Sequence, residues 1–127
     1  MEQRFTGYEL HRDEVDTVHR RARYATFLHG ANRDLEALPE LNKGIQLAPD
    51  NYSLYRDLAA SYIRLSRADD AIAALQRSLE IRPTASAYSS LATLYYSQGR
   101  YTDSAATFEK AVAIDAGNRS TDSMRTR

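Results

Sequence analysis

One set of residues occurs twice between Tyr55 and Ala116. Tyr55 is matched by Tyr88, 33 positions later (88 − 55), and its neighbours are matched at the same interval. The first set is Tyr55, Leu58, Ala59, Tyr62, Leu75, Leu79 and Ile81, and the second is Tyr88, Leu91, Ala92, Tyr95, Phe108, Val112 and Ile114. Such an interval is typical of stacked helical hairpins, because one hairpin cannot bury its apolar face without a neighbour. The sequence therefore predicts an all-α stack whose surface binds another chain.

The spacing within one unit predicts a helix. From Ser53 to Ser66, large apolar residues recur at intervals of three and four, which places them on one side of a helix. Alanine at Ala59, Ala71 and Ala92 lets two helix axes approach to about 8 to 10 Å. We expect Leu58, Leu91 and Tyr62 to be buried within and between the hairpins.

The residues of both units resemble the tetratricopeptide repeat family. In one unit the resemblance rests on Tyr55, Leu58, Ala59, Tyr62, Ala71, Leu75, Leu79 and Pro83, and in the next on Tyr88, Leu91, Ala92, Tyr95, Gly99, Tyr101, Phe108 and Ala111. Three positions depart from the family: Ser104 replaces a helix-crossing alanine, Ser66 a turn glycine and Ala116 a closing proline. The resemblance implies a right-handed α-solenoid of helix-turn-helix hairpins.

A fainter copy precedes these two. Stepping back from Tyr55 by the usual interval of about 34 residues places Arg21, Tyr24, Ala25, Leu28, Ala37, Leu41, Ile45 and Pro49 at the matching positions. Arg21 is unsuited to a packing aromatic position, and Gly44 weakens a helix. We therefore expect about three hairpins, with repeats at about 18–51, 52–84 and 85–117. They form a domain at 13–117, after a leader at 1–12 and before a polar tail at 118–127.

Local signals define the helix ends. Asp50 and Asn51 are the candidate N-caps of one helix and Thr84 that of another, and Gly99 suits a left-handed C-terminal turn. The first helix is expected to begin near Asp13. Pro39 falls inside the expected second helix, where proline costs about 3 kcal/mol. We expect that helix to start late, with Pro39 in its first turn, rather than to be kinked.

We expect no complete C-terminal capping helix over the apolar flank of the last hairpin. An exposed end face of a repeat stack is an aggregation liability. Two hypotheses follow: the sequence is a piece of a longer array, or its open end pairs with another copy as a homo-oligomer.

Charge and composition exclude several classes of protein. Seventeen basic residues balance seventeen acidic ones, so no overall field favours nucleic acid or an anionic membrane. The chain has no cysteine for disulfides or zinc, and no apolar run approaches the roughly 18 residues of a membrane span. A small soluble domain with a cytoplasmic location is the default expectation.

Sequence motifs give no sign of catalysis. His11, His19 and His29 are separated by eight and ten positions, so no two share a helix face as metal ligands, and we expect them to be solvated. No nucleophile elbow, phosphate-binding loop or zinc-protease motif occurs. We predict no catalytic, cofactor or metal site, and a protein that is not an enzyme.

In the tetratricopeptide repeat family, the first helix of each hairpin lines a concave groove. The resemblance therefore implies a groove for a protein or peptide partner, lined by His19, Arg23, Thr26, His29, Arg56, Asp57, Ile63, Arg64, Ser89, Thr93 and Tyr96. Tyr96 and Ile63 are the candidate anchors, because large side chains dominate binding hot spots. The alternative is that these positions are ordinary solvated helix faces.

Some family members grip the acidic tails of heat-shock chaperones with a clamp of lysine, asparagine and arginine. The matching positions here are Ala22, Thr26, Asp57, Ser86 and Ser90, which retain no clamp residue. The leading hypothesis is therefore a non-catalytic scaffold that binds a peptide or helical segment in the groove. The alternatives are self-assembly through the uncovered terminal hairpin and a structural spacer in a larger bacterial regulatory protein.

Overall fold

The computed structural model describes the backbone of residues 12–125 and the side chains as far as residue 118. Within residues 12–125 the chain forms six α-helices and no strand. They are α1 (Arg12–Gly30), α2 (Asp34–Leu47), α3 (Tyr52–Arg64), α4 (Ala68–Ile81), α5 (Ala85–Ser97) and α6 (Tyr101–Arg125). The first helix thus begins beside the expected Asp13, while the expected leader lies outside the described residues apart from Arg12.

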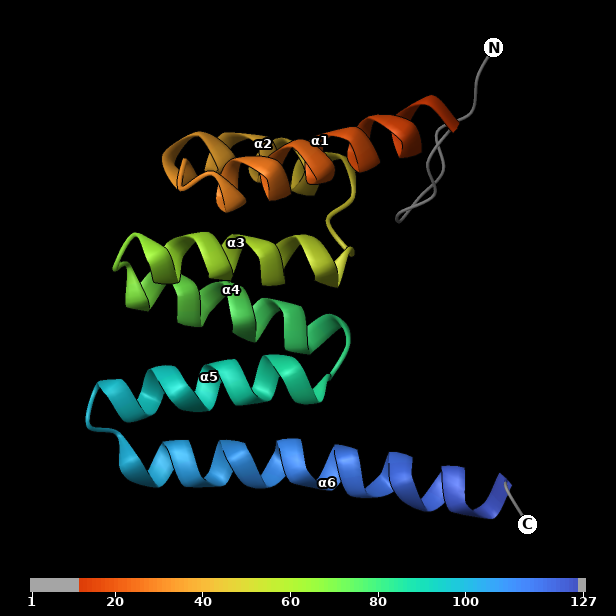
Figure 1. The fold of residues 1–127 in the computed structure, drawn as a ribbon, viewed down its shortest axis with the longest axis vertical. Coiled ribbons are helices and arrows are strands. Elements are labelled where there is room, and N and C mark those ends of the chain that lie inside the picture. The colour runs from red at the N-terminus through yellow and green to blue at the C-terminus, as the bar shows by residue number, and fades with distance from the viewer. Residues whose placement is uncertain (1–11, 126–127) are drawn as a thin grey trace.

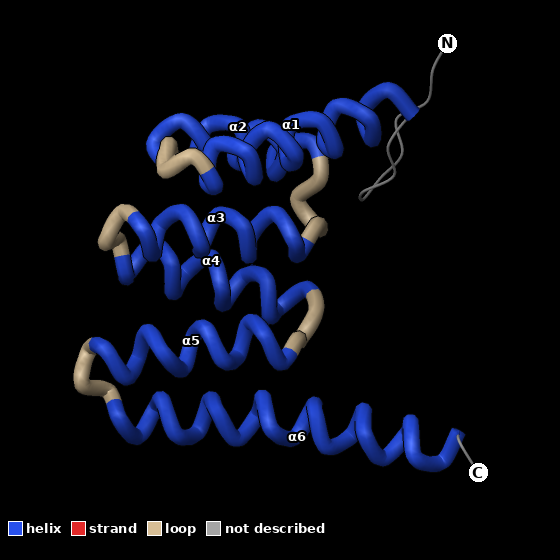
Figure 2. The backbone as a smooth tube through the Cα atoms, viewed as in Figure 1, coloured by secondary structure: helices blue, strands red, loops and turns tan. Residues whose placement is uncertain are grey.

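The helices pair as three hairpins, which stack one below another (Figure 1). Between hairpins, α2 packs on α3 and α4 packs on α5, and α1 also touches α3. The turns within hairpins lie at one edge of the stack and the connections between hairpins at the other (Figure 2). The predicted all-α solenoid of three hairpins is confirmed, and no helix follows α6 within the described residues.

The turn inside each hairpin has one conformation, repeated three times. Asn32, Ser66 and Gly99 have φ values of 62°, 61° and 79°, the left-handed region that helix C-terminal turns use. The residue after each donates its amide to a carbonyl five positions earlier, at 2.7, 2.8 and 2.9 Å. The left-handed turn predicted at Gly99 is confirmed, and the degenerate first repeat has the same register as the others.

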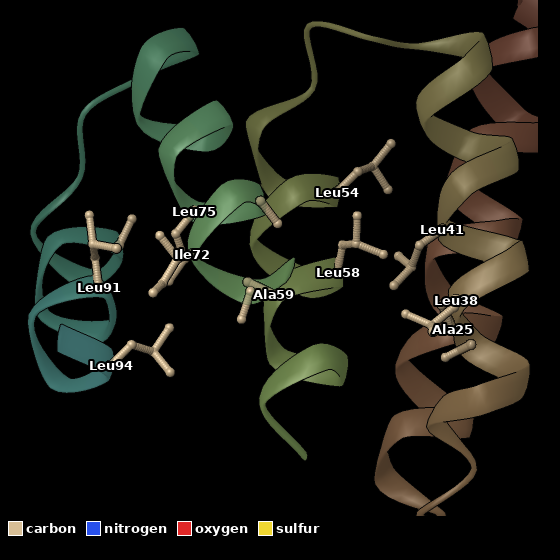
Figure 3. Close-up of a cluster of buried hydrophobic side chains, with 14 of the residues drawn as sticks. Ala25, Leu38, Leu41, Leu54, Leu58, Ala59, Ile72, Leu75, Leu91 and Leu94 are labelled. Atoms are coloured by element: carbon tan, nitrogen blue, oxygen red, sulfur yellow. The ribbon is translucent and has the colours of Figure 1, made fainter. Parts of the chain in front are cut away.

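The core follows the repeated pattern. Leu58 and Leu91 are buried as predicted, whereas Tyr62 is half-buried with the Arg67 guanidinium 4.9 Å from its ring centre. Figure 3 shows Leu58 directed toward Leu41 of the first hairpin. On the other side of the second hairpin, Ile72 and Leu75 face Leu91 and Leu94. One continuous apolar core therefore joins the three hairpins.

Small residues stand where helices cross. Ala59, Ala71 and Ala92 are all buried, in keeping with a close approach of the helix axes. Ser104, which departs from the family at such a position, is buried too, and its Oγ donates to the Ala92 carbonyl at 2.8 Å. A serine fits this crossing because its hydroxyl has a backbone acceptor within reach.

The expected late start of the second helix is wrong. α2 begins at Asp34, so Pro39 lies in its second turn rather than its first. Pro39 cannot donate to the Leu35 carbonyl, but both residues are exposed, so water can bond to that carbonyl. The prediction failed because it applied the average free-energy cost of a proline inside a helix. That cost is smaller where the carbonyl that loses its hydrogen bond faces water.

The other departures in the first hairpin have structural reasons. Arg21 extends from α1 to α2, where its Nη1 donates to Glu40 Oε1 at 2.8 Å in place of an aromatic contact. Gly44 lies against Leu54 of the next hairpin, and a Cβ there would be 3.3 Å from Leu54 Cδ1. A methyl group at this position would crowd the packing of α2 on α3.

Of the two candidates Asp50 and Asn51, Asn51 caps α3, and Thr84 caps α5 as predicted. The Asn51 side chain accepts from the amides of Ser53 and Leu54, at 3.0 and 3.4 Å. The Thr84 hydroxyl accepts from the amide of Ala87 at 3.2 Å. The backbone of 118–125, expected as a polar tail, continues α6, because a polar sequence without proline need not end a helix.

Candidate functional site

The eleven residues predicted to line a groove all lie on the first helix of a hairpin. α1 carries His19, Arg23, Thr26 and His29, α3 carries Arg56, Asp57, Ile63 and Arg64, and α5 carries Ser89, Thr93 and Tyr96. We call this surface the first-helix face. Each of the eleven is exposed or half-buried, so the whole set is accessible to a partner.

One stripe crosses the first-helix face at matching positions of the repeat. It consists of His29, Ile63 and Tyr96, separated by 34 and 33 positions (63 − 29 and 96 − 63). Ile63 is 44% exposed and Tyr96 63% exposed. The Tyr96 ring meets the Tyr101 ring edge to face, with 5.1 Å between centres. The stripe therefore presents two large side chains to solvent, one of which is oriented by a neighbour.

A cavity opens between α1 and α3 at the His29 end of the stripe. Its volume is about 70 Å³, and its lining residues are Ala25, Thr26, His29, Leu41, Asp57, Ala60 and Ser61. We call it the α1–α3 pocket. Three predicted groove residues, Thr26, His29 and Asp57, meet here from two different hairpins. Since a water needs about 10 to 15 Å³ of such volume, the pocket has room for a small chemical group.

A polar network around the buried Asp34 lies beside this pocket, and His29 is the residue that belongs to both. His29 Nδ1 lies 2.5 Å from Asp34 Oδ1, and Arg64 Nε lies 3.6 Å from Asp34 Oδ2. Arg64 Nη1 also donates to the His29 carbonyl at 2.6 Å and to Asn32 Oδ1 at 2.5 Å. The network ties the turn of the first hairpin to the end of α3.

The same network assigns the two His29 nitrogens. Arg64 Nη2 lies 3.1 Å from His29 Nε2, and a guanidinium can only donate. In the neutral ring Nε2 therefore accepts, and Nδ1 carries the proton that is donated to Asp34. Both nitrogens are used inside the protein, so the expectation that His29 is solvated is wrong. His19 is exposed, as expected, and His11 lies outside the described residues.

The two carboxylates near the pocket have opposite electrostatic settings. Burial acts to raise the pKa of Asp34, but the hydrogen bond from His29, the nearby Ser61 hydroxyl and the charges of His29 and Arg64 outweigh it, so the pKa lies below its ordinary value. Burial raises the pKa of Asp57, and the charges of Arg56 and His29 offset only part of this effect. The carboxylate of Asp34 is thus stabilised by hydrogen bonding and by a positive charge. The carboxylate of Asp57 lacks a partner that compensates for its burial.

Ser61 is a buried residue of the pocket wall. The residue is 1% exposed, and its Oγ makes no hydrogen bond of ordinary geometry within the protein. It is near enough to Asp34 to help lower the pKa of that carboxyl. Buried polar side chains are nearly always hydrogen-bonded, so an unpaired hydroxyl beside a cavity indicates a position where a ligand can bind.

The other predicted residues are not brought to the pocket. His19 and Arg23 are exposed on α1, and Thr93 donates to the Ser89 carbonyl of its own helix at 2.9 Å. The Arg56 guanidinium lies 5.9 Å from the centre of the Tyr52 ring. Arg64 is engaged by the first hairpin, so the two arginines of α3 are not a pair of free cations.

Sequence reasoning missed Asp34, Asn32 and Ser61. The matching positions for Asp34 in the later hairpins are Ala68 and Tyr101 (34 and 67 positions on), so an acidic residue here is a departure from the repeat. That departure was the available signal. It could not identify the partners, because Arg64 lies 30 residues away in sequence (64 − 34).

A second surface of note is the side of α6 that faces away from α4. Phe108 is 42% exposed and Val112 60% exposed, and Ala105 beside them is exposed as well. We call these three residues the α6 flank. Tyr101 extends the exposed apolar surface toward the start of the helix. No described helix covers this flank.

The described part of the chain contains no group of three or more histidine, cysteine, aspartate or glutamate side chains that could hold a metal ion. None of its helices is long and apolar enough to cross a membrane.

Comparison with known proteins gives a consistent result. The Hsp70-Hsp90 organizing protein of Triticum aestivum is 34% identical over 89 residues, which are 69% of this chain and 15% of that protein. A crystal structure of MamA has a TM-score of 0.80 at 20% identity, covering 81% of this chain and 61% of the other. MamA from residue 41 to its end, from Desulfovibrio magneticus RS-1, has a TM-score of 0.74 at 19% identity, covering 76% and 55%.

These matches differ in what they establish. The chain spans about 15% of the length of the curated relative and less than two thirds of the MamA chains. The two MamA structures show the fold alone. The tetratricopeptide repeat family matches residues 50–117, more than half of the sequence. The chain therefore belongs to the tetratricopeptide repeat family, whose fold generally serves as a protein-interaction scaffold.

Proposed function

We propose that this protein is a non-catalytic scaffold that binds a peptide or helical segment of a partner protein along the first-helix face. The observation that carries the proposal is the convergence of Thr26, His29 and Asp57 on the α1–α3 pocket. The exposed side chains of Ile63 and Tyr96 continue from it along one stripe. A pocket at one end and large side chains beyond it form a surface that can hold an extended or helical segment.

Tyr96 is the principal anchor of this proposal. Aromatic side chains dominate binding hot spots because they bury a large area at a small cost in conformational entropy. The contact with Tyr101 restricts the Tyr96 ring before any partner arrives. Ile63 occupies the matching position one hairpin earlier and supplies a second apolar contact.

The partners of the wheat relative are not carried over to this chain. At the positions that match the chaperone-tail clamp, the chain has Ala22, Thr26, Asp57, Ser86 and Ser90. The Asp57 carboxylate lines the pocket, where it would repel an acidic tail. The proposed partner therefore does not present a carboxylate to this end of the first-helix face.

The test is capture of partner proteins from a lysate of the source organism by immobilised variants. We expect Tyr96→Ala to reduce recovery of the specific partner at least tenfold, with the helical circular dichroism and the melting temperature nearly unchanged. Surface substitutions seldom cost more than about 0.5 kcal/mol of stability. The matched control is Tyr24→Ala, since Tyr24 is also exposed but lies on a different side of α1. An unaltered partner set with Tyr96→Ala contradicts the proposal.

A second candidate function is self-assembly through the α6 flank. It is favoured by the exposure of Phe108 and Val112, because the stack has an open apolar end there. A stable symmetric contact would bury more than about 1,000 Å². Light scattering over a dilution series should show a dimer at high concentration and a monomer for Phe108→Lys. A mass equal to one chain at every concentration contradicts this candidate.

A further inference from the structure

We propose that the α1–α3 pocket binds a primary ammonium group, that of a lysine side chain in the partner segment, between the Asp57 carboxylate and the Ser61 hydroxyl. The pocket and its lining residues are features of the structure and do not depend on the proposed function. The identification of its occupant as a partner lysine rests on the proposed function.

The charges on the walls favour a cation. Among the seven lining residues, Asp57 alone carries a carboxylate, and His29 has both ring nitrogens engaged by Asp34 and Arg64. Arg56 is the nearest arginine along α3, and its guanidinium lies over the Tyr52 ring. An anion would therefore meet an acidic wall with no free cationic side chain among the lining residues. An ammonium would supply the positive partner that Asp57 lacks.

The Ser61 hydroxyl makes the site specific for a hydrogen-bond donor. It is 1% exposed, lines the pocket, and has no hydrogen bond of ordinary geometry within the protein. Its oxygen can accept a hydrogen bond from an occupant. A purely apolar occupant would leave this oxygen and the Asp57 carboxylate without partners, which disfavours it.

The number of acceptors matches an ammonium. Thr26 Oγ1 donates its own hydrogen to the Ala22 carbonyl at 3.0 Å, so it retains lone pairs as an acceptor. Thr26, Asp57 and Ser61 thus offer three acceptor groups on the pocket walls. A lysine ammonium has three donors, whereas a guanidinium has five in a planar fork. Ala25, Leu41 and Ala60 complete the walls and can contact the methylene groups of the lysine stem.

The volume agrees with this occupant. About 70 Å³ is several times the roughly 10 to 15 Å³ that one water requires. An ammonium with its last methylene groups fits within that space. The remainder of the side chain would extend toward the stripe formed by His29, Ile63 and Tyr96.

The experiment is a titration of the isotope-labelled protein with Nα-acetyl-lysine methylamide, followed by amide chemical shifts in nuclear magnetic resonance spectra. We expect saturable shifts at Thr26, Asp57 and Ser61. The uncharged analogue Nα-acetyl-norleucine methylamide should bind at least tenfold more weakly. Asp57→Asn should weaken lysine-analogue binding at least tenfold, and Ser61→Ala by a smaller factor. Asp115→Asn, an equal charge change at an exposed position of α6, should leave the affinity unchanged.

Several outcomes overturn the proposal. Equal binding of the lysine and norleucine analogues would show that the pocket recognises only apolar groups. Tighter binding of acetate than of the lysine analogue would show an anion site. Wild-type affinity in both Asp57→Asn and Ser61→Ala would show that the amine binds elsewhere. If Asp57→Asn does not fold, Ser61→Ala and the norleucine comparison still decide the question.

The same variants separate this inference from the proposed function. Partner capture could depend on Tyr96 and yet be unchanged by Asp57→Asn. That result would overturn the ammonium site but leave the proposed scaffold function intact. The opposite result is also possible: the lysine analogue binds at the pocket, but Tyr96→Ala leaves partner capture unaffected. That result would overturn the proposal that partners bind along the first-helix face, and the ammonium-binding pocket would stand.

Discussion

The second helices of the last two hairpins carry the same apolar pattern but differ in burial. Leu75 of α4 is 1% exposed, whereas Phe108, 33 positions later (108 − 75), is 42% exposed. Leu79 is half-buried, and its counterpart Val112 is 60% exposed. The difference arises because α5 packs on α4 and no described helix packs on α6 in that way. The repeat pattern therefore specifies which side is apolar, and the neighbouring hairpin decides whether that side is buried.

The inner sides of the two helices do not differ in this way. Ala71 of α4 is buried against its own hairpin, and Ser104 and Ala111 of α6 are buried likewise. The last hairpin is thus closed internally as firmly as the middle one. Within the described residues, it makes no contact with a following hairpin.

The largest expected effect tests burial at matched positions. Leu75→Ala should lower the free energy of unfolding by about 2 to 5 kcal/mol, because it leaves a cavity between two hairpins. Phe108→Ala should cost about 1 kcal/mol, because much of its ring already contacts water. Urea unfolding of the two variants beside the parent measures both values. Equal losses would show that another chain covers the α6 flank under the conditions used, or that the matched register is wrong.

The next effect concerns the opposite end of the stack. Among the helices that the structure describes, the first hairpin also packs on one neighbouring hairpin, and Asp34 joins it to Arg64 of α3. Asp34→Asn should lower the free energy of unfolding by about 1 to 3 kcal/mol at neutral pH, since it removes the negative partner of Arg64 and the carboxylate that His29 Nδ1 contacts. Urea unfolding at several pH values measures the loss, and Asp16→Asn at an exposed position of α1 is the control.

The pH dependence of that loss has a definite sign. The pKa of Asp34 is lower in the folded protein than the ordinary value of 3.8. Its contribution is therefore complete above the unfolded pKa and disappears as the pH falls through the folded pKa. The difference between parent and Asp34→Asn should shrink in that acidic range. A difference that stays constant down to the folded pKa would mean that the Asp34 charge is not its source.

A smaller effect should be the same in both later hairpins. The guanidinium groups of Arg67 and Arg100 lie 4.9 and 4.3 Å from the ring centres of Tyr62 and Tyr95. Arg67→Ala and Arg100→Ala should each cost less than about 1 kcal/mol, because exposed ion pairs and cation–π contacts are weak. Thermal melts should give nearly equal shifts, since these contacts lie within a hairpin. A much larger shift for one variant would show that these contacts depend on the neighbouring hairpin.

The smallest expected effect is a gain. Burial raises the pKa of Asp57, so its ionised form is less favourable in the folded than in the unfolded protein. Asp57→Asn should raise the melting temperature slightly at neutral pH. As the pH falls below the folded pKa, the parent carboxyl becomes protonated in the folded protein, so the gain should shrink, and it should vanish below the unfolded pKa. A loss of stability at neutral pH would show that the Asp57 charge already has an adequate partner.

Much of the fold could be predicted because the repeat determines it locally. The interval from Tyr55 to Tyr88, the cap at Thr84 and the turn at Gly99 each depend on neighbouring residues, and all agree with the structure. The position of Pro39 in its helix was predicted wrongly, because the sequence does not show that the carbonyl left without a hydrogen bond is exposed to water. The continuation of α6 through 118–125 was not predicted, because a polar segment gives no apolar periodicity from which a helix can be recognised.

The candidate site was only partly predictable. Thr26, His29 and Asp57 were named from their repeat positions, and those positions place them on one face. Asp34 and Ser61 were missed, because their importance depends on burial and on partners from another hairpin. Repeat position predicts which way a residue faces, whereas the chemistry of a pocket depends on the residues that break the repeat.

The stacking order also has a kinetic consequence. All the main packed helix pairs in the described residues belong to one hairpin or to adjacent hairpins, so native contacts are close in sequence. Such a low contact order favours rapid folding, because few long loops must be closed before contacts form. Opening can also begin at a terminal hairpin without disrupting the remainder. Amide protons of α6 should then exchange with solvent faster than those of α3 and α4.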